Sequence, residues 1–267
     1  MDLEKICKQT VSAVKEAGEY IACEKGRKNS INIEEKGLHN FVTRVDTTAE
    51  KMLVERLSEI LPGSGFITEE GTAEKKDGEY NWVIDPLDGT TNFIHGLPPY
   101  SVSVALLEEE KVVAGVVHEI NLNECFYSWK GAPAFLNGRQ INVSETKKVN
   151  DSLIATGFPF TDYSLIRPFL KCLEHCMQKS RGVRRLGSAA VDLAYLACGR
   201  FDAFYEYGLS PWDVAAGGFI IQQAGGKVTD FSGGDKFLYG GEIIAANSFV
   251  FKEFFQMING FMEREKK

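Results

Sequence analysis

The feature that most constrains this chain is an apolar run that ends in closely spaced acids. Trp82-Val83-Ile84 has the composition of a buried strand, and the chain continues directly into Asp85-Pro86-Leu87-Asp88-Gly89-Thr90. A buried strand cannot end in two unpaired carboxylates, because isolated buried charge is costly in free energy. The fold must therefore either open these acids to water or supply cations beside them.

Acids also follow or open apolar segments at two other places. Glu69-Glu70 follows Phe66-Ile67-Thr68, and Asp213 stands at the start of an apolar helical stretch. Taken alone, the two glutamates suit a solvated strand end, and Asp213 suits a helix N-terminus, where the macrodipole favours negative charge. Taken together, oxygen ligands without an organised His or Cys cluster favour a hard cation such as Mg²⁺ over zinc.

The run after Asp85 also has the composition of an anion site. Pro86 restrains the backbone, so we expect a tight loop here. This loop would present the carboxylates of Asp85 and Asp88 on one side, with the Leu87 carbonyl between them. Gly89 permits a conformation that a side chain would block, and the amides that follow could converge on an anion. The alternative is a capped turn in which Asp and Gly serve only the backbone geometry.

The rest of the chain alternates predicted helices with short strands. Apolar periodicity predicts helices over 3–21, 46–60, 162–180, 188–198 and 212–223 and from 248. Thr47-x-x-Glu50 fits a capping box for the second helix. Apolar runs between turn signals predict strands over 66–68, 82–84, 101–107, 112–117, 124–129, 201–205 and 243–246. This mixture indicates a layered α/β or α+β class, and we expect residues 1–267 to form one domain because no linker or repeat interrupts them.

Composition limits the partners that suit the chain. Its net charge is −7, which disfavours direct nucleic-acid binding because that binding relies on basic patches. The six cysteines form no CxxC pair, which is typical of free thiols in a reducing compartment. The first residues form an amphipathic pattern and no run is apolar enough for a membrane span. We therefore expect a cytoplasmic protein that does not enter a membrane.

The acids of two sites lie within longer motifs, residues 84–93 (IDPLDGTTNF) and residues 212–217 (WDVAAG). These motifs resemble the first and second signatures of the inositol monophosphatase family. Glu69-Glu70 sits at the family's upstream glutamate position, and residues 187–190 (GSAA) match a segment before the second signature. The similarity covers nearly the whole chain. It implies the layered αβαβα sandwich of the sugar-phosphatase superfamily, a homodimer, and Mg²⁺-dependent hydrolysis of myo-inositol monophosphate to inositol and phosphate.

The resemblance also implies roles for individual residues. Two or three Mg²⁺ ions, with Mn²⁺ as a possible substitute, would be held by Glu69, Asp85, the Leu87 carbonyl, Asp88 and Asp213. The family's nucleophile is a water activated by the metal, which Glu69 and Thr90, the latter paired with Asp46, would orient and deprotonate. Substrate contacts are implied for Asp88, Gly89, Thr90, Gly187, Ser188, Ala189, Glu206 and Asp213. Family members are often inhibited by lithium.

Two further positions bear on the substrate. Ser210-Pro211 stands where animal inositol monophosphatases have a His and a Cys, so we expect a polyol pocket that differs in detail. Arg184-Arg185 is either a charge pair in solvent or at a dimer interface, or brings one arginine to a substrate oxygen or a second phosphate across a subunit boundary.

The scaffold leaves several functions open. Related enzymes cleave fructose 1,6-bisphosphate, 3′-phosphoadenosine 5′-phosphate or histidinol phosphate, and fold alone does not decide among them. Glu206 favours a polyhydroxylated substrate, because a carboxylate accepts hydrogen bonds from hydroxyls and repels a second phosphate. Some bacterial relatives act as regulators associated with RNA polymerase, and a Mg²⁺ storage or structural module is a third possibility.

Overall fold

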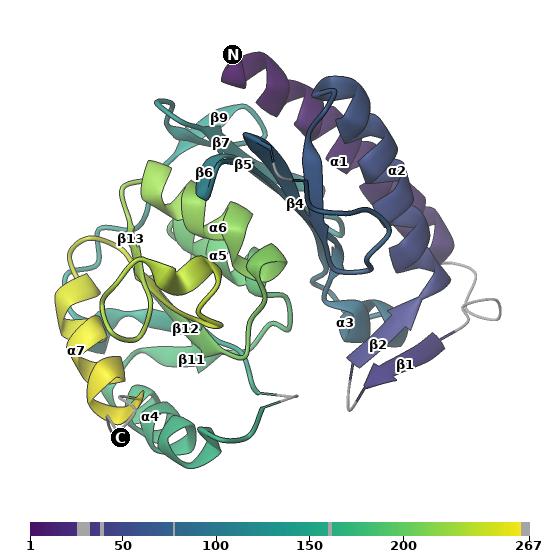
Figure 1. The fold of residues 1–267 in the computed structure, drawn as a ribbon. Helices are drawn as coiled ribbons and strands as arrows, with labels where there is room; N and C mark the ends of the chain where they lie inside the picture. The colour runs from purple at the N-terminus through teal and green to yellow at the C-terminus, as the bar shows by residue number, and fades with distance from the viewer. Residues whose placement is uncertain (26–32, 38–39, 77, 160–161, 263–267) are drawn as a thin grey trace.

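The helices and strands of the computed structural model form five alternating layers (Figure 1). The structure describes residues 1–25, 33–37, 40–76, 78–159 and 162–262. Two helices, a large sheet, two more helices, a smaller sheet and a last pair of helices follow one another in space. The layered αβαβα sandwich that the family resemblance implies is confirmed, whereas the extent of the domain over 1–267 stays a prediction.

The large sheet lies beneath the first helical layer. Its seven strands run in the order β3-β4-β5-β6-β7-β8-β9; β3 is parallel to β4 and the other pairs are antiparallel. Their bounds are β3 Gly65–Thr68, β4 Tyr80–Asp88, β5 Ser101–Glu108, β6 Lys111–Glu119, β7 Glu124–Trp129, β8 Ala134–Leu136 and β9 Arg139–Ile141. Helices α1 (Leu3–Lys25) and α2 (Arg44–Ile60) cover one face, where their apolar stripes pack on Trp82 and Ile84.

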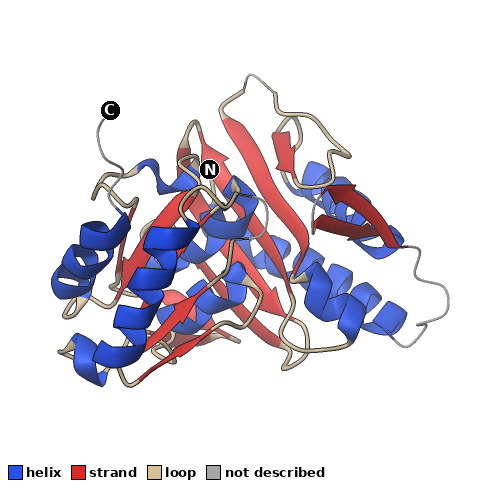
Figure 2. Ribbon diagram, turned by 90° about the horizontal axis from the view of Figure 1, so that it is seen from below, coloured by secondary structure: helices blue, strands red, loops and turns tan. Residues whose placement is uncertain are grey.

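The central helical layer consists of α5 (Ala189–Ala197) and α6 (Pro211–Gln223). Both helices are apolar almost all round because each lies between two sheets, an arrangement that Figure 2 shows from below. Gly115 in β6 makes the approach of α6 possible, since a Cβ there would lie 2.9 Å from the Ala216 carbonyl oxygen. The central layer therefore sits close to the large sheet, and both helices begin at the same end of the molecule as the acids of β4.

The smaller sheet and the outer helices complete the sandwich. Five strands run in the order β11-β10-β12-β14-β13, with β10 parallel to both β11 and β12. Their bounds are β10 Leu153–Thr156, β11 Gly182–Arg184, β12 Ala203–Tyr207, β13 Lys227–Thr229 and β14 Glu242–Ala246. Helices α4 (Ile166–Lys179) and α7 (Phe251–Met262) cover the outer face over a core that includes Phe169, Tyr205 and Phe254. Within the described ranges, no helix has the length and apolar character that crossing a membrane requires.

Short elements connect these layers. The hairpin β1 (Ile33–Gly37) and β2 (Asn40–Thr43) leads into α2, and the short α3 (Thr90–His95) follows β4. Two 3₁₀ turns lie at η2 (Val149–Asp151) and η3 (Lys236–Leu238). The short strands β8, β9, β10, β11 and β13 were not among the predicted strands.

The prediction for the start of the second helix was wrong in detail. Helix α2 begins at Arg44, and its capping box pairs Thr43 with Asp46 rather than Thr47 with Glu50. The aspartate carboxylate reaches back to the Thr43 N–H at 3.0 Å, as the longer Glu side chain does in the usual motif. Glu50 is consequently free to bind another part of the chain.

Candidate active site

A cavity of about 300 Å³ opens where the carboxyl end of β4 meets the starts of α5 and α6. All of the predicted site residues except Asp46 line it, together with five residues that were not assigned to the site. Those five are Thr91, Gly157, Arg185, Asp192 and Leu209. The fold therefore brings together acids that are separated by more than a hundred positions in the sequence.

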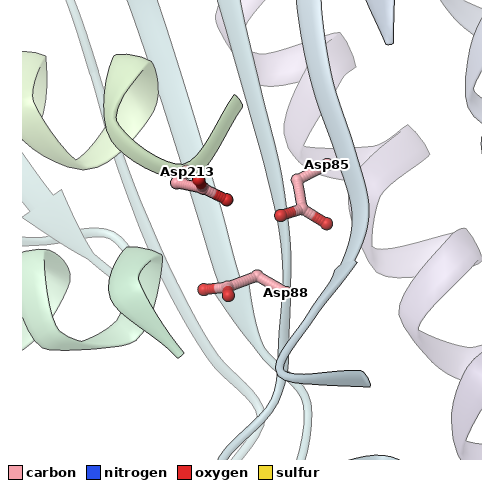
Figure 3. A group of neighbouring side chains, drawn as sticks. All are labelled: Asp85, Asp88 and Asp213. Atoms are coloured by element: carbon pink, nitrogen blue, oxygen red, sulfur yellow. The ribbon is translucent and has the colours of Figure 1, made fainter. Parts of the chain in front are cut away.

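Three aspartates face one another inside this cavity (Figure 3). Each of Asp85, Asp88 and Asp213 offers a carboxylate oxygen, and these oxygens all lie within 4.8 Å of one another. Asp85 and Asp88 come from the end of β4, and Asp213 comes from the first turn of α6. Such a cluster of oxygen ligands has the chemistry of a site for hard divalent cations.

A bulge, rather than the predicted tight loop, places the two acids of β4. The strand continues through Pro86 to Asp88, and Asp85 pairs with Ser103 while Asp88 pairs with Ser101. Three steps along β4 thus oppose two steps along β5, so β4 carries one extra residue. In a regular strand, residues three apart point to opposite faces, and the extra residue turns both carboxylates toward the same cavity.

Backbone and hydroxyl donors hold one side of each carboxylate. Asp88 accepts hydrogen bonds from the Ser188 hydroxyl at 2.5 Å and from the Ala190 N–H at 2.7 Å, at the start of α5. Asp213 accepts one from the Ser210 N–H at 2.6 Å, which closes the capping box of α6. The departure from the animal sequences at Ser210-Pro211 therefore has a structural use here, because the serine caps the helix and proline suits its first turn.

The cluster is electrostatically strained without a counter-charge. Burial raises the pKa of Asp88 to about 6, and burial followed by the charge of Asp88 raises the pKa of Asp213 to about 7. Burial and then Asp213 raise the pKa of Glu69 to about 8, and burial and then Glu69 raise the pKa of Asp85 well above its usual range. Among the described residues that line the cavity, Arg185 alone is basic. Divalent cations fit this site because they would relieve the repulsion among its oxygen donors.

A second group of contacts ties Thr90 to the first helical layer. The Thr90 hydroxyl lies 3.1 Å from a carboxylate oxygen of Asp46 and 3.0 Å from the Leu87 carbonyl oxygen. Asp46 is 1% exposed and its other oxygen accepts the capping bonds of Thr43. The predicted pairing of Thr90 with Asp46 is thus present, although Asp46 itself does not line the cavity.

Glycine is required at the turn between β4 and α3. Gly89 has a φ of +94°, and a Cβ there would lie 3.1 Å from the Pro99 carbonyl oxygen and 3.2 Å from the Gly187 carbonyl oxygen. Asn92 fastens the same turn, since its side-chain amide donates to the carbonyls of Pro99 and Leu186 at 2.8 Å each. The segment from 187 to 189 is thereby held against the turn between β4 and α3.

The far side of the cavity is formed by Glu206, Asp192 and Arg185. Glu206 lies in β12 and is 7% exposed, and Gly157 leaves room for it because a Cβ at that position would lie 1.7 Å from Oε1. Both arginines are exposed, but Arg185 lines the cavity whereas Arg184 does not, and the Arg184 guanidinium donates to the Val183 carbonyl. Asp192 and Gly157 had no distinguishing sequence signal: the first resembles an ordinary acid in the first turn of a helix.

Comparisons with known proteins agree on one family. The model of the inositol monophosphatase family matches residues 2–260. The inositol-1-monophosphatase of Mesorhizobium japonicum is 41% identical over 241 residues, covering 90% of this chain and 91% of that protein. The Nus factor SuhB of Pseudomonas aeruginosa is 42% identical over 245 residues, covering 90% of each. The crystal structure of the extragenic suppressor protein suhB from Bartonella henselae superposes with a TM-score of 0.90 at 37% identity, covering 94% of this chain and 97% of that one.

Proposed function

The chain belongs to the inositol monophosphatase family, as its two motifs predicted, and from that premise we propose that it hydrolyses myo-inositol monophosphate to inositol and phosphate. The observation that carries this proposal is the convergence of Asp85, Asp88 and Asp213 on one cavity. Beside that cluster lies a polar chamber with buried carboxyl groups that suit the hydroxyls of a polyol. The chain is accordingly a phosphoric monoester hydrolase.

The cations in this proposal are two or three Mg²⁺ ions, for which Mn²⁺ can substitute. The residues that would hold them are Glu69, Asp85, Leu87 through its carbonyl, Asp88 and Asp213. When bound, Mg²⁺ would neutralise the phosphate, lower the pKa of a water molecule and stabilise the leaving alkoxide. The support is the chemistry of the donor set, which consists of oxygens; burial and then the charges of neighbouring carboxylates raise the pKa of Asp85 and Asp213.

The protein's own groups would orient the attacking water and receive its proton. The Thr90 hydroxyl is fixed between Asp46 and the Leu87 carbonyl, so it can hold a water in one direction. Glu69 lines the same cavity, and its carboxylate would accept the proton of a water held there. We assign Glu69, Thr90 and Asp46 as the catalytic group on this basis.

The remaining assignments concern the substrate. Asp88, Gly89 and Thr90 would contact the substrate, and so would Gly187, Ser188 and Ala189, which lie beside them. Glu206 and Asp213 would accept hydrogen bonds from the polyol hydroxyls. Support comes from the lining of the cavity by all eight residues.

Phosphate release across a substrate panel tests the assignment. The panel consists of myo-inositol 1-phosphate, fructose 1,6-bisphosphate, 3′-phosphoadenosine 5′-phosphate and histidinol phosphate, each with Mg²⁺. We expect the inositol ester to be cleaved with the highest kcat/KM. A bisphosphate that is cleaved much faster than the inositol ester would contradict the substrate assignment.

We also propose that the protein is cytoplasmic and forms a homodimer. We further propose that lithium inhibits it by replacing Mg²⁺ at the three aspartates. Light scattering coupled to gel filtration would show a species of about twice the 29.7 kDa chain mass if the dimer forms. Inhibition of phosphate release by lithium should weaken as Mg²⁺ is raised, because the two ions would compete. A monomer in solution, or inhibition independent of Mg²⁺, would contradict these points.

A second candidate function is regulation in association with RNA polymerase. The observation that favours it is the name of the Pseudomonas aeruginosa relative, a Nus factor. Capture of RNA polymerase by the wild-type protein and by an Asp88→Asn variant separates the two functions. If both proteins capture the polymerase while the variant has lost phosphate release, binding is independent of catalysis. If neither does, this candidate fails.

A further inference from the structure

A buried acid at the far side of the cavity has a carboxyl oxygen without a hydrogen-bond partner among the described residues. Asp192 lies in the first turn of α5 and is 1% exposed. Its Oδ1 atom is enclosed and forms no hydrogen bond with the part of the chain that the structure describes. Buried polar atoms in native proteins are nearly always hydrogen-bonded, because leaving one unpaired costs about 1–3 kcal/mol. Asp192 lines the cavity while its Oδ1 has no hydrogen-bond donor among the described residues, so its carboxyl group is a candidate for a ligand contact.

Charged neighbours of Asp192 further disfavour its ionised form in the protein without substrate. The charges of Glu206 and then Asp88 add to burial in raising the pKa of Asp192 well above its usual range, and only Arg185 opposes them. Nothing in the first turn of α5 requires this acid as a cap, because Ser188 already caps the helix. Burial and the neighbouring acids thus disfavour the ionised form of Asp192, and Ser188 rather than Asp192 caps the helix.

Arg185 faces the same part of the cavity without an ion pair. Its guanidinium lies 5.6 Å from the centre of the Phe158 ring. No salt bridge joins it to an acid of the described residues, although its charge acts on both Asp192 and Glu206. We call Asp192, Glu206 and Arg185 together the hydroxyl subsite.

We propose that Asp192 is a specificity-determining residue that accepts a hydrogen bond from a hydroxyl of the substrate's leaving group. This inference rests on the proposed function, because it concerns the leaving group of the phosphate ester. Neighbouring hydroxyls can donate to the two carboxyl groups and accept from the guanidinium at the same time. A second phosphate has no comparable donors and would face two acids, so the hydroxyl subsite selects a polyol over a bisphosphate.

The test compares two esters that differ in their hydroxyls. myo-Inositol 1-phosphate can occupy the hydroxyl subsite, whereas 4-nitrophenyl phosphate has no hydroxyl to place there. In Asp192→Leu, which removes the acceptor, the ratio of kcat/KM for the first ester to that for the second should fall by about tenfold or more. In Asp192→Asn, which keeps the shape and one acceptor oxygen, the ratio should fall by about threefold or more.

A matched control lies immediately before β12. Asp202 is also a buried aspartate, at 7% exposed, but it is bonded to Ser144 and to the Leu153 N–H at the end of the strand remote from Glu206. Asp202→Asn should lower the melting temperature and leave the ratio unchanged. Asp192→Asn should not lower the melting temperature, because the aspartate is unpaired in the free protein.

The outcomes separate this inference from the proposed function. A wild-type protein that cleaves both esters, with Asp192 variants whose ratio stays within twofold of wild type, would overturn the role of Asp192 alone. If Asp192→Leu does not fold, the Asp192→Asn ratio decides. A wild-type protein that releases phosphate from neither ester would overturn the proposed function and this inference with it.

Discussion

The carboxylate of Glu50 accepts a hydrogen bond of 2.8 Å from the backbone N–H of Glu70. Its other oxygen accepts from the N–H and the hydroxyl of Thr72, at 2.9 and 2.7 Å. Glu50 is fully buried in α2, so one side chain of the first layer clamps the loop that follows β3. The predicted metal ligand Glu69 lies directly before this clamped segment.

Replacing Glu50 by glutamine should therefore weaken the metal site. The glutamine NH₂ would face a backbone N–H, so at least one of the three hydrogen bonds is lost and one donor is left unpaired. We expect stability to fall by about 1–3 kcal/mol. We also expect Mn²⁺ binding, followed by electron paramagnetic resonance of the free ion, to weaken because Glu69 is less firmly placed.

Glu119→Gln is the matched control for that variant. Glu119 is 1% exposed and clamps another loop through three hydrogen bonds, from the N–H and side-chain amide of Asn121 and from the N–H of Leu122. It does not line the cavity. Glu119→Gln should lower the free energy of unfolding to a similar extent and leave Mn²⁺ binding unchanged. Equal Mn²⁺ affinities for wild type and Glu50→Gln would refute the positioning role.

Stability of the metal-free protein should fall as the pH rises. Glu69, Asp88 and Asp213 have folded pKa values of about 8, 6 and 7, above the values of acids in an unfolded chain. The folded state therefore holds protons that the unfolded chain has released, and this contribution is lost between about pH 4 and pH 8. Urea unfolding in EDTA and in Mg²⁺ measures it. The stabilisation by Mg²⁺ should grow from pH 5 to pH 8. A difference in unfolding free energy between Mg²⁺ and EDTA that stays the same at every pH would contradict this prediction.

The buried His118 should make the protein less stable as the pH falls, which is the opposite of the effect of the acid cluster. Burial lowers its pKa to about 4, and its ring packs against Gly18, where a Cβ would lie 2.6 Å from Cδ2. Because the folded pKa is below the unfolded value near 6.5, stability is lost as the pH falls through that interval. Between pH 7 and pH 5 this loss should be about 2 kcal/mol. The unfolding free energy of His118→Gln, measured in urea, should not show this loss between pH 7 and pH 5. A loss as large as that of wild type would contradict the assignment to His118.

The acid cluster could be predicted from the sequence because its members stand at the ends of apolar runs. Asp85 and Asp213 both meet that description, and the family motifs added the order of the layers. The bulge in β4 could not be predicted, because the face on which Asp88 lies depends on its register with β5. The capping box of α2 was misplaced for a related reason, since Asp46 and Glu50 both fit local patterns and only tertiary contacts separate their roles.

The substrate side of the cavity was less accessible to sequence analysis. Arg184 and Arg185 are adjacent, and successive residues of an extended segment point to opposite sides, so one enters the cavity and the other does not. Asp192 is distinguished only by what surrounds it, because its first-turn position on α5 is ordinary for an acid. These features depend on packing between the two sheets, which no local pattern encodes.

We propose that cations held by the aspartate cluster drive phosphate ester hydrolysis. Phosphate release from myo-inositol 1-phosphate, measured against Mg²⁺ concentration for wild type, Asp85→Asn and the Asp202→Asn control, tests it most directly. We predict no release in EDTA, saturation with Mg²⁺ for wild type and Asp202→Asn, and a rate below about a tenth of wild type for a folded Asp85→Asn. Release that persists in EDTA, or an Asp85→Asn rate above that level, would contradict the account.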